Sequence, residues 1–148
     1  MSTYTQILYQ IIFSTKERKK SINFDNQKQL YKYIFGIIKN KNCHLYRIGG
    51  VEDHIHIVTH LHPSIALADF IKDIKVSSSS WIKDQNIFKK FDNWQIGYAA
   101  FTYSIKSKEN LINYAINQKE HHRKKTYIEE LKELLKEHNI NYDEKYLL

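Results

Sequence analysis

The stretch CHLYRIGGVEDHIHIVTHL, residues 43–61, carries the pattern that decides the fold. It predicts two strands, Cys43–Gly49 and Val51–Leu61, joined at a Gly-Gly pair that is typical of a β-hairpin. Side chains alternate along a strand, so His54 and His56 share one face while the isoleucines beside them share the other. The pattern therefore predicts two imidazoles on one face of the sheet, about 6.7 Å apart along the strand.

Strands and helices alternate on both sides of this hairpin. The predicted elements are a strand at Tyr4–Ser14 with two apolar faces, a helix at Asn23–Asn40, a helix capped by Ser64, a strand at Gln95–Ile105, a helix from Ser107 to about His121, and a last amphipathic helix. The order β-α-β-β-α-β predicts an α+β, ferredoxin-like or RRM-like fold, with a four-stranded antiparallel sheet and additional C-terminal helices. In that fold the first and third strands are central, so the two histidines are expected on a central strand.

Composition limits the class of protein. The chain has 148 residues and a formal net charge of +7, and we expect one domain over residues 1–148, with a C-terminal helix and tail from about residue 126. The single cysteine, Cys43, excludes an intramolecular disulfide and a cysteine-rich zinc site. No apolar run approaches the roughly 20 residues of a membrane span, and the N-terminus lacks the pattern of a signal peptide. These features predict a cytoplasmic protein with no membrane partner.

The charge is unevenly distributed. From Thr126 onward, six acidic residues and three lysines give a net charge of −3, so residues 1–125 carry +10. Basic residues cluster at 16–20 and again at 119–125. Such a body is typical of a protein that binds a nucleic-acid backbone, although a lysine-rich solvated surface explains the same composition.

The histidine pair is a candidate metal site. Two imidazoles on one strand face can bind one cation, but two ligands do not complete a metal shell, and hydrogen-bonded histidines explain an isolated pair equally well. A second pair, His60 and His62, follows at once; it abuts a proline at the strand end and is the lesser candidate.

Tyr114 is a candidate nucleophile. Gln118 lies one helical turn after it, and His121 or His122 extends the same face. A free phenol ionises only near pH 10, so a tyrosine nucleophile needs a group that stabilises its phenolate or takes its proton, and a nearby divalent cation and basic side chains would do so. The alternative is a tyrosine that packs on the sheet with its hydroxyl at the rim.

Together the two motifs resemble those of a known family. His-hydrophobic-His on a central strand, followed by Tyr-x-x-x-Gln-x-x-His-His, is similar to the single-tyrosine HUH transposases of small bacterial insertion sequences, which include the insertion-sequence-200-like and palindrome-associated enzymes. The resemblance extends nearly from end to end, through ILYQIIFSTK, GGVEDHIHIV, WQIGYAAFTYSIKS, INYAINQKEHHRKK and NYDEKYLL.

The resemblance implies a mechanism and a set of partners. It implies that Tyr114 attacks a phosphate of single-stranded DNA near a hairpin at an element end, forming a 5′-phosphotyrosine and a free 3′-hydroxyl. His54, His56 and Gln118 would hold Mg²⁺ or Mn²⁺, and Asp53 would orient a ligand. The family works as homodimers in which one subunit can complete the other's site. A bacterial, nucleoid-associated location follows when DNA is bound.

Basic residues outside the motifs are then candidate DNA contacts, considered as clusters. They are Lys16, Arg18, Lys19 and Lys20 after the first strand, Lys72 and Lys75 beside the small Ser77–Ser80 stretch, and Arg123, Lys124 and Lys125 after the tyrosine helix. Two other functions stay open: a non-catalytic nucleic-acid-binding module on the same sheet, and a small hydrolase with a histidine-bound zinc.

Overall fold

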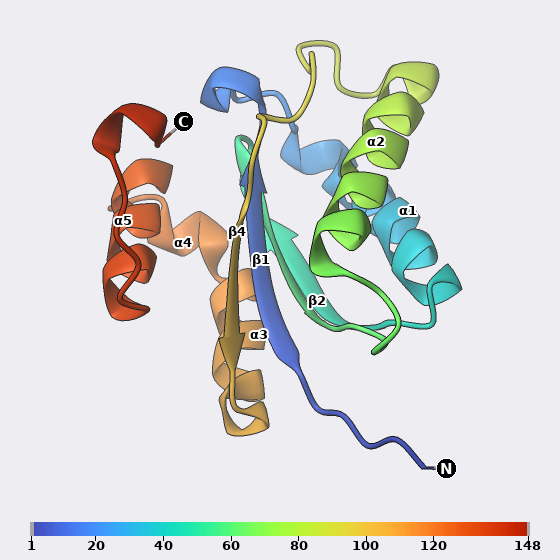
Figure 1. Cartoon of the computed structure of the whole chain (residues 1–148). Coiled ribbons are helices and arrows are strands. Elements are labelled where there is room, and N and C mark those ends of the chain that lie inside the picture. Colours follow the sequence, from blue (N-terminus) through green and yellow to red (C-terminus); the bar gives the residue numbers. More distant parts are fainter. Residues whose placement is uncertain (1, 148) are drawn as a thin grey trace.

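A four-stranded antiparallel sheet with helices on both faces forms the molecule (Figure 1), in a computed structural model that describes residues 2–147. The strands are β1 (Leu8–Ser14), β2 (His44–Gly50), β3 (His54–His60) and β4 (Ala99–Tyr103), in the spatial order β2-β3-β1-β4. The main helices are α1 (Gln27–Asn40), α2 (Leu67–Gln85), α3 (Lys108–Ile116), α4 (Gln118–His121) and α5 (Tyr127–Glu137). This confirms the predicted α+β fold, with β1 and β3 in the centre.

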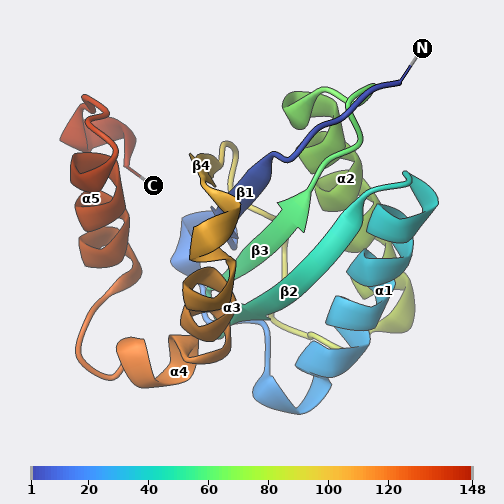
Figure 2. The same ribbon diagram turned by 90° about the horizontal axis from the view of Figure 1, so that it is seen from below.

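The two faces of the sheet are covered by different helices. Helices α1 and α2 pack on one face, and α3 and α5 lie on the other (Figures 1 and 2). The first face carries the larger core, in which Ile55 and Ile57 of β3 pack with α1 and α2 residues such as Ile34 and Phe70. On the second face, Leu111 of α3 packs beside β1 and β3, and the leucines of α5 pack against Ile12 and Phe101. Because the isoleucines of β3 occupy the first face, its histidines project toward α3 and α5.

The hairpin turn lies two to three residues later than the sequence predicts. Gly49 and Gly50 belong to β2 and pair with β3, and the chain reverses at residues 51–53. Gly49 is required by packing instead of by the turn: a Cβ on it would lie 1.9 Å from the backbone oxygen of Ala115 in α3. The missing side chain therefore lets α3 lie directly on the sheet.

Several predicted boundaries are wrong for local reasons. The first strand begins at Leu8 instead of Tyr4, and the fourth spans only Ala99–Tyr103, because Gly97 at φ 95° interrupts it. The predicted helix to His121 breaks at Asn117, which has non-helical φ/ψ of −90° and 17° and separates α3 from α4.

The predicted cap and the serine stretch of α2 also differ. Ser64 does not cap α2, which begins after Ala66; its hydroxyl bonds the His62 ring instead. Within Ser77–Ser80, Ser78 is buried and accepts a hydrogen bond from the Trp94 indole at 2.9 Å. That stretch is thus occupied by protein. Among residues 2–147, none of the helices combines the length and apolarity needed to cross a bilayer.

Candidate active site

His54 and His56 lie on the β3 face that α3, α4 and α5 cover. Both side chains are fully buried, and their ring centroids are 5.2 Å apart. The alternation that places both imidazoles here also places Ile55 and Ile57 in the opposite core, which fixes the strand between two packed layers. The imidazoles are therefore held by the fold and not by a mobile loop.

His54 is held between acceptors on both ring nitrogens. Its Nδ1 lies 2.7 Å from the Asp53 carboxylate and its Nε2 lies 3.1 Å from Oε1 of Gln118. Burial alone would lower the pKa of His54, but the hydrogen bonds to Asp53 and Glu130 outweigh it and raise that pKa to about 9. The carboxylate of Asp53 can only accept a hydrogen bond, so Nδ1 of His54 carries a proton and donates it. Nε2 of His54 then presents either a second proton or a lone pair to the oxygens of Gln118 and Glu130.

His56 has a different environment. Burial lowers its pKa to about 4, so this imidazole is neutral. Its Nδ1 lies 3.3 Å from the amide nitrogen of Gln10, and its Nε2 lies 3.2 Å from Oε1 of Glu130. Gln10 in turn accepts a hydrogen bond from the Tyr103 hydroxyl at 2.7 Å. Gln10 is the one polar residue of the apolar stretch LYQIIF in β1, and that exception in the sequence could have identified it.

Tyr114 and Gln118 meet the histidines despite the helix break between them. Gln118 is fully buried; its amide nitrogen donates to the backbone oxygen of Tyr114 at 3.1 Å while its Oε1 faces His54. The Tyr114 hydroxyl donates to Oε2 of Glu130, and its ring lies 5.5 Å from that of His56 and 4.6 Å from that of His121. Burial and the neighbouring carboxylate raise the pKa of Tyr114 well above its ordinary value. The Tyr114 phenol is thus kept protonated in this arrangement.

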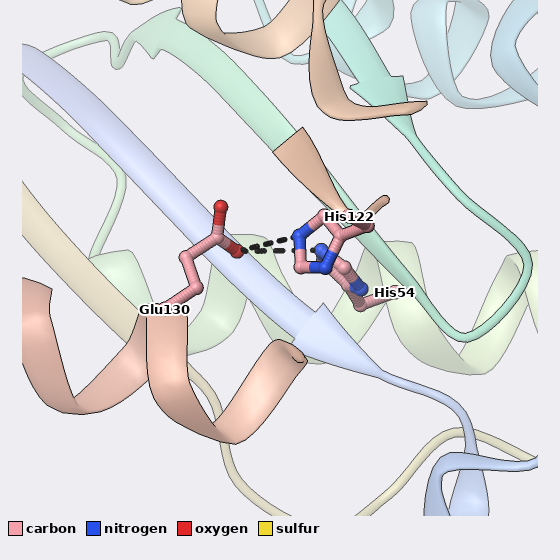
Figure 3. Close-up of side chains that lie close together, drawn as sticks. All are labelled: His54, His122 and Glu130. Atoms are coloured by element: carbon pink, nitrogen blue, oxygen red, sulfur yellow. Dashed lines mark ion pairs between the residues drawn. The ribbon is translucent and has the colours of Figure 1, made fainter. Parts of the chain in front are cut away.

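Glu130 of α5 lies at the centre of this cluster and was not predicted. Its side chain is 2% exposed, and Figure 3 shows it extending from α5 toward His54 and His122. Oε1 lies 3.4 Å from Nε2 of His54 and 3.3 Å from Nε2 of His122. The surrounding imidazoles of His54, His56 and His122 lower the pKa of Glu130 far below its usual range, although burial opposes that shift. An acidic residue inside the apolar stripe of an amphipathic helix is the signal that could have revealed it.

The cluster contains a set of donors suited to a cation. One donor atom from each of His54, His122 and Glu130 lies within 4.8 Å of the others, and Nε2 of His56 and Oε1 of Gln118 face the same region. His54 presents Nε2 to two oxygens, which is unfavourable unless a proton or a cation lies between them. Imidazole, amide and carboxylate donors together fit a divalent metal ion.

A basic cleft of about 450 Å³ adjoins the cluster on the His122 side. Its lining includes five basic side chains, which are Lys20, Lys119, Arg123, Lys124 and Lys125. Asp53 and His122 also line it, so the cleft and the buried cluster share residues. The cluster 16–20 lies at the same end of the sheet, because Ser14 pairs with His54 and Thr15 donates to the backbone oxygen of Asp53. Lys20 of this cluster lines the cleft, whereas Lys16 is paired to Asp92 at 3.5 Å; Arg18 and Lys19 lie between them in the chain.

Two predicted DNA contacts lie elsewhere. Lys72 and Lys75 are on α2, which covers the opposite face of the sheet from the histidines. The Lys75 ammonium donates to the backbone oxygens of Gln95 and Gly97, each at 2.7 Å, so it fixes a loop. Of the second histidine pair, His60 contacts the backbone of Ile7 and His62 bonds Ser64.

Comparison with known proteins identifies a family and a fold. Residues 3–119 match the family described as Transposase IS200 like. Among solved structures, a proposed transposase from Deinococcus radiodurans R1 is similar with a TM-score of 0.62 at 19% identity, over 80% of this chain and 95% of that one. A REP-associated tyrosine transposase bound to a REP hairpin has a TM-score of 0.60 at 13% identity, over 82% of this chain and 74% of that one. No curated protein sequence matches significantly.

Proposed function

Because the chain belongs to the IS200-like transposase family, we propose that it cleaves and rejoins single-stranded DNA with Tyr114 as the nucleophile. One observation carries this assignment: a tyrosine hydroxyl, two strand histidines and a glutamine converge on one buried carboxylate beside a basic cleft. A packing tyrosine needs none of these partners. A pure binding module would explain the cleft and leave the buried polar cluster without a role.

The chemistry follows from the groups present. The Tyr114 oxygen forms a bond to phosphorus as the bond from phosphorus to the 3′-oxygen breaks, and the phenol proton ends on the leaving 3′-hydroxyl. The product is a 5′-phosphotyrosine, whose phosphoester bond energy lets another 3′-hydroxyl reverse the step without ATP. His121 lies against the Tyr114 ring and supports its orientation. Arg123, Lys124 and Lys125 line the adjoining cleft, where they would hold the flanking phosphates.

His54, His56 and Gln118 are the residues that would hold the metal, Mg²⁺ or Mn²⁺. Asp53 fits a positioning role, because its carboxylate fixes Nδ1 of His54 as a donor and turns Nε2 toward Gln118. Gln10 of β1 holds His56 in a different way, because its amide nitrogen donates to Nδ1 of that imidazole. When bound, the ion polarises the scissile phosphate and lowers the pKa of a nucleophile beside it.

The DNA partner is proposed to carry hairpins, in line with the hairpin-bound structural neighbour. Every residue of the described site comes from one chain, so the cluster does not need a second subunit to bring Tyr114 to the histidines. A homodimer with shared sites stays a prediction from family resemblance. A bacterial cytoplasmic location is likewise a prediction from that resemblance.

The experiment incubates the protein with single-stranded oligonucleotides that carry hairpins, with Mn²⁺, and looks for a denaturation-resistant protein–DNA adduct. Tyr114→Phe should abolish the adduct, while Tyr33→Phe, a phenol stacked on Trp81 on the other face of the sheet, should retain it. An adduct that survives Tyr114→Phe refutes the assignment. Cleavage without any covalent species would instead indicate the histidine–zinc hydrolase, for which three imidazoles and a carboxylate are a suitable donor set.

A further inference from the structure

We propose that Glu130 is itself a ligand of the metal ion, supplied by the C-terminal helix α5 and shared with the nucleophile Tyr114. The inference deepens the proposed function and rests on it. The family match ends at residue 119, so this carboxylate comes from a part of the chain that the match does not include.

Helix α5 places the carboxylate firmly. Thr126 and Glu129 form a capping box at its N-terminus, which fixes where the helix begins. Leu131, Leu134 and their neighbours bury the apolar face against Ile12 and Phe101 of the sheet. Glu130 lies one helical turn before Leu134 and one turn after Tyr127, on the same buried side of α5, so its burial follows from the packing and periodicity of the helix.

The two oxygens of Glu130 face different groups. Oε1 faces Nε2 of His54, His56 and His122 at 3.4, 3.2 and 3.3 Å. Oε2 accepts hydrogen bonds from the Tyr114 hydroxyl and, at 3.3 Å, from the amide of Gln118. One carboxylate therefore joins Tyr114 to the imidazoles of His54, His56 and His122.

The spacing on the Oε1 side is that of neighbouring ligands around one ion. With metal–donor bonds of about 2.1 Å, adjacent donors lie about 3.0 Å apart in an octahedral shell and about 3.4 Å apart in a tetrahedral one. The distances from Oε1 to the three imidazoles fall in that range. Nε2 of His122 also has no aligned hydrogen-bond partner although it is buried, so it too is free to bind an ion.

Charge supports the same role. Two imidazoles and the Gln118 amide form a neutral set of ligands, whereas a carboxylate adds the negative charge that a divalent cation prefers. A buried carboxylate is costly unless it is paired, and a divalent cation compensates its charge more completely than hydrogen bonds from imidazoles do. The ion and α5 should thus stabilise each other.

The test measures Mn²⁺ binding to the full chain without DNA, by electron paramagnetic resonance of the free ion and by the Mn²⁺-induced rise in the unfolding temperature. Glu130→Gln keeps the size of the side chain and removes its charge, and we expect at least about tenfold weaker binding. Glu133→Gln makes the same charge change at an exposed position of α5 and should leave binding unchanged. If Glu130→Gln does not fold, Glu130→Asp withdraws the carboxylate by one methylene and must also weaken binding.

The outcomes separate this inference from the proposed function. Equal or tighter Mn²⁺ binding by Glu130→Gln overturns the inference, since the carboxylate would then fill the metal site without binding the ion. The proposed function survives that result if His54→Ala with His56→Ala abolishes binding and Tyr114→Phe abolishes the adduct. A wild-type chain that binds no Mn²⁺ overturns both.

Discussion

Gly49→Ala is the substitution that most directly tests how the sheet positions Tyr114, the proposed nucleophile. Gly49 lies in β2 opposite His56, and α3 crosses directly above it. A Cβ at this position would lie 1.9 Å from the oxygen and 2.5 Å from the carbon of the Ala115 carbonyl. Ala115 is the residue after Tyr114, so any movement of this backbone also moves Tyr114.

The magnitude follows from the contact. To restore an ordinary carbon–oxygen separation of about 3.4 Å, α3 must move by roughly 1.5 Å. Because the obstruction is backbone, no side-chain rotation relieves it, and overpacking of this kind costs about 1–3 kcal/mol of unfolding free energy. A misplacement of about 1 Å at a reacting group can lower the rate about 100-fold. We expect both effects from one methyl group.

Urea unfolding and the rate of covalent adduct formation measure the two effects. Gly36→Ala is the matched control, because Gly36 lies within α1 and a Cβ there meets nothing within 4 Å. It should raise stability by about 0.5–1 kcal/mol through helix propensity and leave the adduct rate unchanged. If Gly49→Ala is as stable and as fast as wild type, α3 does not rest on β2 as described and the placement of Tyr114 is wrong.

Three other predictions concern pH, the helix cap and the cleft. Without metal, the free energy of unfolding should be greatest near pH 6.5. The pKa of His54 is raised to about 9, so its contribution to stability declines as pH rises from 6.5 toward 9. The pKa of His56 is lowered to about 4, so its contribution declines as pH falls from 6.5 toward 4. Urea unfolding in EDTA should show a loss of about 2 kcal/mol between pH 6.5 and 8.5, and a gain would contradict the assignment. Thr126→Ala removes the capping box of α5 and should cost about 1 kcal/mol in the same assay. Arg123→Ala should weaken binding of single-stranded DNA and lower its salt dependence by about 0.7 in log–log slope, whereas Lys72→Ala, on the other face of the sheet, should do neither.

The sequence by itself determined the topology and the histidine pair. Alternation along residues 54–58 requires His54 and His56 to share a face, and Ile55 and Ile57 to fill the core behind them, whatever the rest of the chain does. The β-α-β-β-α-β order then made β3 central. These features are local, because they depend only on the period of the strand and on the order of the elements.

The tertiary structure alone decided what surrounds the imidazoles. Gln10, Gln118 and Glu130 reach the pair from β1, α4 and α5, and the hydrogen bonds that Gln118 and Glu130 make to it span 64 and 74 residues of sequence. Periodicity marks Glu130 as a charge in an apolar stripe but cannot say which side chains it meets. That choice depends on how closely α3 and α5 approach the sheet, which is set by Gly49 and by leucine packing across sequence-distant elements.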